Sequence, residues 1–380
     1  MRIAVFDYRV IANNPVGSCH LKMLAGLCEQ HDFTVFAVEF ENPDPARIRW
    51  VRIPLPVRPY VLLYGLFHLA APLAYFYQRF VRGHRFDLVQ VVESNLAIGH
   101  ISYSHFCHRM YLKRHWRETR PAGMRGVLRG LAHWSAARME PLVYSRVRHV
   151  VVPSRGLSAE LSAEYPSQEK KIHRLPNPVD VERLAPPAPQ ERDELRTALG
   201  IDSQSVVLMF AALGHFERKG LPLALEAVRR LHEPRVRMLV VGGERGLVAA
   251  YRSQIREMGL EQIVRFEGMQ RDLRRYYWAA DAFILPSSYE VFPLVALEAA
   301  AAGLPLLATP LNGVEEMLLD HENGFLLDRS TEGVLQGIRE LLALTTEQRR
   351  AMGARARETA SRYSTRNFVS AWRDLYANLA

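Results

Sequence analysis

The sequence predicts an α/β protein built from two Rossmann-like, doubly wound domains, and two observations lead to this fold class. Short apolar runs alternate with helical patterns through both halves of the 380 residues, as expected for βα units with parallel sheets. Between the halves, residues 175–189 read LPNPVDVERLAPPAP, and five prolines there discourage regular structure. Two such domains facing across a cleft would bind ligands at the carboxyl ends of their strands.

The apolar runs define the expected strands in order. In the first half they are Ile3–Phe6, Thr34–Glu39, Leu88–Val92, Ile101–Ser104 and Val150–Pro153. In the second half they are Val206–Ala212, Met238–Val241, Ile263–Phe266, Ala282–Leu285 and Pro305–Ala308.

The domain boundaries follow from the proline-rich stretch and from the end of the chain. Residues 365–379 form an amphipathic helical pattern that carries Phe368, Trp372 and Tyr376 at helical spacing. We expect a first domain over 1–177, a second over 178–360, and a final helix over 361–380 that packs back on the first domain.

Composition places the chain among ordinary globular proteins, with 48% hydrophobic and 23% charged residues. The three cysteines form no CxxC pair and their number is odd, which argues against a disulfide framework and favours a reducing compartment. The opening residues MRIAVFD resemble a buried strand rather than a signal peptide. We therefore expect a cytoplasmic protein.

The net charge of +9 is unevenly distributed. Residues 1–180 hold 24 Lys and Arg against 14 Asp and Glu, whereas residues 181–380 hold 25 against 26. Most of the excess lies between Arg109 and Arg148, with ten basic and two acidic residues. A one-sided basic surface predicts an anionic partner, namely a membrane face, a phosphorylated acceptor or a nucleic acid.

The segment 59–78, PYVLLYGLFHLAAPLAYFYQ, carries no formal charge. Its length would allow it to span a bilayer, but a span inside the first βα domain would put one sheet on two sides of the membrane. Two interpretations stay open: a buried or inter-domain helix, or an aromatic-rich surface that docks into the membrane interface.

Two glutamates stand out in the segment 287–303, SSYEVFPLVALEAAAAG. Pro293 suits the first turn of a helix and Gly303 its end, and Glu298 is the only polar side chain between them. A helix that is apolar all round is buried, and a lone buried carboxylate needs a partner such as a ribose diol. Glu290 precedes the helix, where free N–H groups favour an anionic ligand. Taken singly, a buried ion pair and a capping acid would also explain the two residues.

A second informative segment is 213–225, LGHFERKGLPLAL, which follows an expected strand. Gly220 and Pro222 mark a loop that enters a helix, so Arg218 and Lys219 lie at a helix N-terminus. Cations there oppose the helix dipole, and a bound diphosphate would reverse the sign of that interaction. A solvated basic turn is the alternative.

At these residues the sequence resembles a known family, the family 4 retaining glycosyltransferases of the GT-B fold. Glu290 and Glu298 match its EX7E motif, and further segments match its other motifs in family order. These segments are Val151–Ser154, Leu175–Asp180, Gly214–Gly220, Thr309–Glu315 and Asn323–Leu326.

The resemblance implies roles for individual residues of a nucleotide-sugar site. Glu290 would hold hydroxyls of the donor sugar, Glu298 the ribose, and Arg218 with Lys219 the diphosphate. Additional donor-site and base-contact residues by resemblance are Gly214, Val291, Phe292, Pro293, Leu294, Gly268 and Met269. The sequence lacks a DxD pair, which agrees with a metal-independent mechanism, and neither a metal nor another cofactor is expected.

The first half departs further from the family pattern. The family carries a glycine pair in the first βα loop, whereas Asn13–Ser18 offers only Gly17, and we retain Gly17 and Ser18 as loop contacts. His105 falls where the family often has a cleft histidine, and it would support the acceptor or the donor sugar. A structural histidine is the alternative. The nearby His100, His108 and His115 match no metal-binding spacing.

The sequence thus predicts a retaining glycosyltransferase that uses a UDP- or GDP-sugar and acts on a lipid-linked or envelope glycan at the inner membrane face. A soluble transferase acting on a small molecule or natural product, and a hydrolysing epimerase of the same fold, are alternatives. A basic nucleic-acid-binding protein and a non-catalytic sugar-nucleotide sensor belong to other classes. The basic stretch lacks an interleaved aromatic platform, which disfavours nucleic acid.

Overall fold

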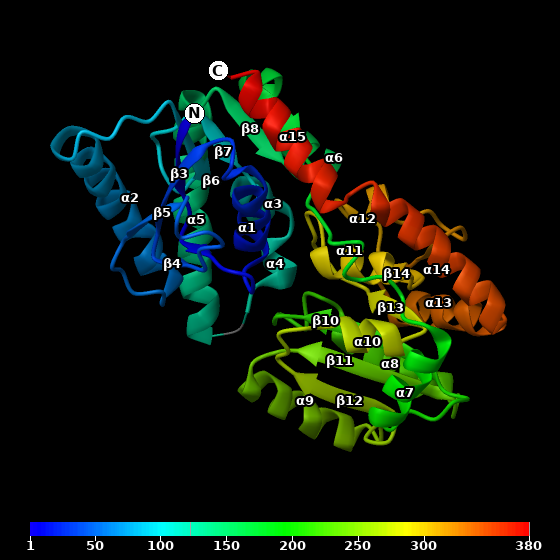
Figure 1. Cartoon of the computed structure of the whole chain (residues 1–380). Coiled ribbons are helices and arrows are strands. Elements are labelled where there is room, and N and C mark those ends of the chain that lie inside the picture. The colour runs from blue at the N-terminus through cyan, green and yellow to red at the C-terminus, as the bar shows by residue number, and fades with distance from the viewer. Residues whose placement is uncertain (122, 380) are drawn as a thin grey trace. The chain divides into compact units, whose positions relative to one another are not determined.

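The computed structural model describes residues 1–121 and 123–379, and the chain forms two compact units (Figure 1). Unit 1 comprises Met1–Pro178 and Thr365–Ala380, and unit 2 comprises Val179–Ser364. Each unit contains its own parallel sheet, and helices connect most of the successive strands. The α/β fold class with two Rossmann-like domains is therefore confirmed.

Unit 1 is built on a seven-stranded parallel sheet with the order β5-β3-β1-β6-β7-β8-β9. Its strands are β1 (Arg2–Phe6), β3 (Asp32–Ala37), β5 (Arg49–Arg52), β6 (Leu88–Val92), β7 (Ile101–Tyr103), β8 (His149–Val152) and β9 (Ile172–Arg174), with a separate pair β2 (Arg9–Val10) and β4 (Glu39–Phe40). Its α-helices are α1 (Pro15–Leu27), α2 (Tyr60–Phe76), α3 (His108–Arg114), α4 (Trp116–Thr119), α5 (Gly123–Arg146), α6 (Arg155–Glu164) and α15 (Thr365–Ala377), together with the π-helix η1 (Tyr77–Val81) and the 3₁₀ helix η2 (Pro166–Lys171).

Unit 2 is built on a six-stranded parallel sheet with the order β12-β11-β10-β13-β14-β15. Its strands are β10 (Val206–Ala212), β11 (Val236–Gly242), β12 (Val264–Gly268), β13 (Ala282–Leu285), β14 (Leu306–Ala308) and β15 (Gly324–Leu326). Its helices are α7 (Pro189–Ala198), α8 (Leu221–Leu231), α9 (Arg245–Glu257), α10 (Arg274–Ala279), α11 (Leu294–Ala301), α12 (Val314–Met317), α13 (Thr331–Ala343) and α14 (Thr346–Ser361).

The C-terminal helix α15 belongs to unit 1, although unit 2 precedes it in the chain (Figure 1, red). It packs against α1 and buries Trp372 and Tyr376 completely. The Tyr376 hydroxyl donates a hydrogen bond of 2.7 Å to Gln90 Oε1 on β6. The helix begins at Thr365, four residues after the expected position 361.

The uncharged segment becomes the helix α2, which continues into the short π-helix η1. One face, which includes Leu63, Phe67 and Tyr75, is buried, while Leu69 and Leu73 are 67% and 69% exposed. Within the described residues, the stretch Tyr60–Val81 is long and apolar enough to cross a membrane by length and composition, a test that core helices of soluble proteins also pass.

Candidate functional site

In unit 2 the loop after β10 is pressed against the loop after β13. The loop after β10 ends at Gly220, the N-cap of α8, which has a φ of +80°. A Cβ atom on Gly220 would lie 2.0 Å from the carbonyl oxygen of Pro286, so no larger residue fits this approach. Because parallel strands end at the same edge of a sheet, both loops lie where ligands bind in this fold class.

A buried ion pair joins these two loops. Lys219 Nζ lies 2.6 Å from Glu290 Oε1, and the two side chains are 15% and 7% exposed. Ser287 Oγ donates to the same carboxylate oxygen at 2.6 Å. Burial lowers the pKa of Lys219, with Glu290 opposing and Arg218 adding to that effect. Lys219 and Glu290 are thus held in a fixed geometry beside the N-terminus of α8.

Arg218 contributes both its backbone and an unsatisfied side-chain donor. Its carbonyl oxygen accepts hydrogen bonds from the backbone N–H and the hydroxyl of Ser288, at 2.8 and 3.2 Å. The buried Arg218 Nε has no hydrogen-bond partner among the described residues. An unsatisfied buried donor is costly, and a bound anion would satisfy it. Arg218 and Lys219 lie directly before α8, as the sequence predicts.

The environment of Glu298 differs from the sequence expectation. The helix α11 is not buried on all sides, because Glu298 is half-buried on the same face as Leu294 and Val295. The Tyr277 hydroxyl on α10 donates a hydrogen bond of 3.0 Å to Glu298 Oε2. Burial and the Glu298 charge raise the pKa of Tyr277. The premise of a lone buried carboxylate is therefore wrong, since the protein itself supplies a partner.

Sequence reasoning did not identify Tyr277 as a neighbour of the site. Tyr277 lies in the short helix α10, whose sequence is RRYYWA, and is fully buried, so it resembles an ordinary core residue. No spacing in the sequence connects α10 with α11. Only the tertiary structure brings the tyrosine hydroxyl to Glu298.

The segment between Glu290 and α11 packs closely against the turn that contains Gly313. Gly313 has a φ of +79°, and a Cβ atom there would lie 2.6 Å from the Cα of Phe292 and 2.7 Å from the carbonyl oxygen of Val291. Pro293 is the N-cap of α11, so Leu294 is its first helical residue. This support fixes the backbone of residues 291–294 next to Glu290.

The remaining unit 2 candidates lie at the same edge of the sheet. Gly214 follows the central strand β10, and Gly268 ends the edge strand β12 with a φ of +66°. At both glycines a Cβ atom would meet nothing within 4 Å. Met269 is 48% exposed. The structure leaves space around these residues, and their assignment to the nucleotide stays a prediction.

Gly17 and Ser18 lie in the first turn of α1 rather than in a loop, which corrects the sequence expectation. The N–H of Gly17 donates to Asn14 Oδ1 at 2.9 Å. The N–H of Ser18 donates to the Asn14 carbonyl at 2.7 Å, and the hydroxyl donates to the Pro15 carbonyl at 2.8 Å. These donors are already used inside the helix, and the Asn14 cap that the sequence shows could have revealed this.

His105 follows β7 in unit 1 and has a defined tautomer. Its Nε2 lies 2.9 Å from Asn177 Oδ1, an acceptor, so Nε2 carries the proton. Burial lowers the pKa of His105 to about 4, although the hydrogen bond to Asn177 opposes this. The buried Nδ1 is therefore an acceptor, and it has no partner among the described residues. A ligand hydroxyl would satisfy it.

The other histidines of this region have separate partners. His100 Nδ1 accepts from the N–H of Val89 at 2.9 Å. His108 pairs with His133 and Glu93. Within residues 1–121 and 123–379, no group of three or more His, Cys, Asp or Glu side chains is arranged to hold a metal ion.

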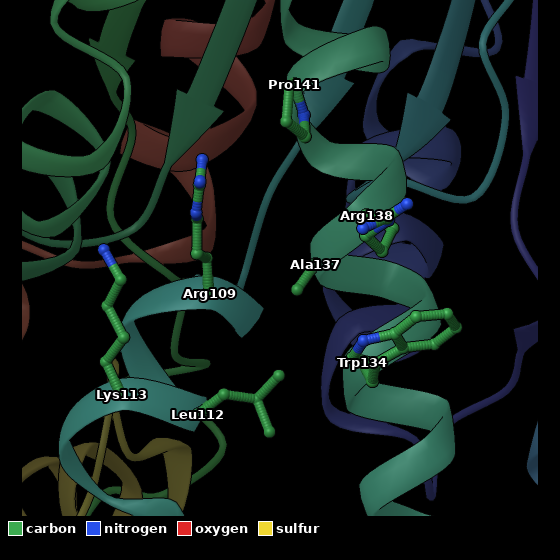
Figure 2. A pocket seen from close by; sticks show the side chains of 7 residues that line it. All are labelled: Arg109, Leu112, Lys113, Trp134, Ala137, Arg138 and Pro141. Atoms are coloured by element: carbon green, nitrogen blue, oxygen red, sulfur yellow. The ribbon is translucent and has the colours of Figure 1, made fainter.

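The basic stretch of unit 1 is partly neutralised and partly apolar. Arg109 and Lys113 on α3 pair with Glu164 at 3.5 and 2.6 Å. Figure 2 shows these cations across from Trp134 and Arg138 on α5, around a pocket of about 430 Å³. The guanidinium of Arg138 lies 5.4 Å from the Trp134 ring centroid. The outer surface of α5 therefore combines cations with exposed apolar side chains, which are Met124, Val127, Leu128, Leu131 and Trp134.

Comparisons with known proteins define the class of this protein. Two family models match consecutive parts of the chain: Glycosyltransferase Family 4 over residues 20–183 and Glycosyl transferases group 1 over residues 191–359. The structure is similar to WaaG, a glycosyltransferase involved in lipopolysaccharide biosynthesis, with a TM-score of 0.78 and 19% identity over 98% of this chain and 99% of WaaG. It is also similar to Anabaena HepE in complex with UDP, with a TM-score of 0.76 and 18% identity over 100% of both chains. The fold is the GT-B fold of glycosyltransferases.

A curated relative gives the same result at the sequence level. The D-inositol 3-phosphate glycosyltransferase of Xylanimonas cellulosilytica is 30% identical over 236 residues, which cover 60% of this chain and 56% of the relative. The chain thus spans little more than half the length of the curated relatives it matches. With both family models matched in order, the chain belongs to the family 4 glycosyltransferases.

Proposed function

We propose that this protein transfers a sugar from a UDP- or GDP-sugar to an acceptor hydroxyl, with retention of configuration and without a metal ion. The observation that carries the proposal is the cluster of Lys219, Glu290 and the unsatisfied Arg218 Nε at the carboxyl edge of the unit 2 sheet. A diphosphate would satisfy Arg218 and add a second anionic partner for Lys219. The solved structure of HepE in complex with UDP supports a nucleotide donor.

The cationic and anionic residues of the site would have different roles. Arg218 and Lys219 would bind the diphosphate and stabilise the negative charge that develops on it as the bond to the sugar breaks. Glu290, fixed by Lys219 and Ser287, would accept hydrogen bonds from sugar hydroxyls. Glu298, oriented by Tyr277, would bind the ribose. In the retaining reaction the acceptor hydroxyl attacks on the face from which the diphosphate departs, its proton passes to the departing diphosphate, and no enzyme nucleophile is assigned.

We place the reaction at an anionic membrane surface, on a lipid-linked or envelope glycan. The support lies in unit 1, where α2 and α5 expose large apolar side chains and α5 also carries arginines. Such a surface suits the interface of an anionic bilayer better than a nucleic acid, because bases require ordered aromatic platforms and phosphates a continuous basic face. A soluble transferase acting on a small molecule remains the alternative.

The donor assignment can be tested by thermal unfolding with UDP and GDP. A nucleotide that binds the native state raises the unfolding temperature by mass action. We expect Lys219→Ala and Glu298→Ala to remove most of this shift and to lower the release of UDP or GDP from the sugar donor. For Lys219→Ala the release should fall by about 100-fold or more, as for loss of a charged transition-state contact. The matched controls are Lys170→Ala and Glu169→Ala, which alter exposed side chains of unit 1.

If Lys219→Ala and Glu298→Ala leave nucleotide release unchanged, the proposed donor site is wrong. If neither UDP nor GDP raises the unfolding temperature of the native protein, the proposed class of donor is wrong.

A further inference from the structure

The carboxyl end of β6 in unit 1 contains a strained residue, Glu93. Its φ is +49°, in the left-handed region that residues with a side chain rarely adopt. Both backbone groups are fixed: the N–H donates to the Tyr103 carbonyl at 3.1 Å, and the carbonyl accepts from Ser102 Oγ at 2.8 Å. Strain that the surrounding structure enforces is typical of functional positions.

The Glu93 carboxylate is held at one of its two oxygens. Oε2 lies 3.4 Å from Nε2 of the buried His108, whose Nδ1 lies 2.9 Å from His133 Nδ1. Burial lowers the pKa of His108, but Glu93 and Glu140 outweigh this and raise it overall. The Glu93 side chain remains 15% exposed. A carboxylate that is positioned by an imidazole and still reaches solvent can accept a ligand hydroxyl.

Unsatisfied polar atoms follow the neighbouring strands β6 and β7. Among the described residues no partner meets either amide atom of Asn95 or His105 Nδ1. The Glu93 charge raises the pKa of both Tyr8 and His105. At His105 it opposes burial, which lowers the pKa of the imidazole. Buried polar atoms are normally satisfied, so a group of them at the ligand-binding edge of a sheet points to a polar ligand.

We propose that Glu93, Tyr8, Asn95 and His105 form the acceptor subsite, and that it takes a neutral, hydroxyl-rich ring rather than a phosphorylated one. This inference rests on the proposed function and specifies its acceptor. Sugar hydroxyls can both donate and accept, which suits a carboxylate, an imidazole acceptor, a phenol and an amide. A phosphate would meet the Glu93 carboxylate and the nearby Asp7 carboxylate, which is bonded to His20 at 2.8 Å. Like charges there would exclude phosphate from the subsite.

The test uses the full chain with ¹⁵N-labelled histidine and two probes that differ only in a phosphate, D-glucose and D-glucose 6-phosphate. The ring resonances of His105 and His108 report on unit 1 alone. We expect glucose to shift both resonances and glucose 6-phosphate to shift them at least tenfold less effectively. Glu93→Gln should weaken the response to glucose about tenfold and reduce the discrimination against phosphate, in keeping with loss of one hydrogen bond to a charged group.

Tyr8→Phe provides a second variant that removes only the hydroxyl and should also weaken the response to glucose. Glu169→Gln, on an exposed turn, is the control and should change nothing. The proposal is overturned if glucose shifts neither resonance, if glucose 6-phosphate acts as strongly as glucose, or if Glu93→Gln leaves both titrations unchanged. Stabilisation by UDP, measured in parallel, reports on the donor site, so its loss with an intact glucose response would reject the proposed function separately.

Discussion

At the residue scale, the donor site shows how charged side chains are kept in place before a ligand binds. Lys219 and Glu290 form a pair that is mostly buried, and Ser287 adds a hydrogen bond to the same carboxylate. Removing one member of a buried pair leaves the other uncompensated, at a cost of about 3 to 5 kcal/mol. The cluster is therefore preorganised, and its remaining unsatisfied donor, Arg218 Nε, is available for a ligand.

His105 gives a pH-dependent prediction. Its pKa is about 4 in the folded protein and 6.5 in the unfolded chain, so the unfolded chain binds more protons between these values. This contribution to stability is complete above pH 6.5 and is lost as the pH falls towards 4, by about 2 kcal/mol at pH 5. We expect His105→Gln to lack this loss, as measured by urea unfolding at pH 7 and pH 5.

The matched control for His105 is His232→Asn, which changes an exposed histidine of unit 2 with a left-handed backbone. Asparagine tolerates that conformation. If native protein and His105→Gln lose equal stability between pH 7 and pH 5, His105 does not carry the effect.

At the scale of elements, the helix α2 combines the two interpretations that the sequence leaves open. Its inner face is buried in unit 1, and its outer face exposes Leu69 and Leu73, followed by Phe80 and Val81 at 72% and 68% exposure in η1. A single helix therefore contributes both to the core of unit 1 and to an exposed apolar face. Whether its outer face meets a membrane is part of the proposal.

The membrane proposal predicts binding to vesicles that contain an anionic lipid. We expect co-sedimentation with phosphatidylglycerol vesicles at low salt and weaker binding to neutral vesicles, because the arginines of α5 add to apolar insertion. Leu69→Ser with Leu73→Ser, or Trp134→Ser alone, should weaken binding roughly tenfold or more, since each exposed apolar side chain contributes about 1 to 2 kcal/mol on burial.

The control for vesicle binding is Leu319→Ser, which removes an exposed leucine of unit 2. Equal binding to neutral and anionic vesicles would reject the electrostatic part of the proposal. Unchanged binding of the α2 and α5 variants would reject the surface itself.

At the scale of the whole molecule, unit 1 is completed by a helix from the far end of the chain. Trp372 on α15 is fully buried and contacts the Tyr103 ring edge-on, with 5.1 Å between centroids. Truncation of a buried aromatic residue to alanine costs about 3 to 5 kcal/mol. We expect Trp372→Ala to destabilise unit 1 by this amount while unit 2 keeps its stabilisation by UDP.

Hydrogen exchange resolved by segment would measure the effect of Trp372→Ala in each unit. Arg366→Ala, on the exposed side of the same helix, is the control. Equal loss of protection in both units would show that they unfold as one cooperative body.

Most of the fold could be predicted because its central strands carry uninterrupted apolar runs. The expected bounds of β6, β10 and β13 agree with the structure to the residue, since both faces of these strands are buried. The edge strands β5 and β9 were missed, because their exposed residues leave no apolar run to detect.

The candidate site was predicted only where its residues are neighbours in the chain. Arg218 and Lys219 lie before α8, and Glu290 lies before α11, as local sequence signals indicate. For Glu298 and for Gly17 the local argument failed, because Tyr277 and the Asn14 cap supply partners that the argument did not consider.

The sequence by itself determined the two βα units, the proline-rich boundary and the charged residues that begin the site helices, because periodicity and helix-end chemistry act over a few residues. Only the tertiary structure decided that Lys219 pairs with Glu290, that Tyr277 meets Glu298, and that Glu93 lies near Tyr8 and His105. These contacts join residues far apart in the chain, and packing of the strands and helices determines which of them meet.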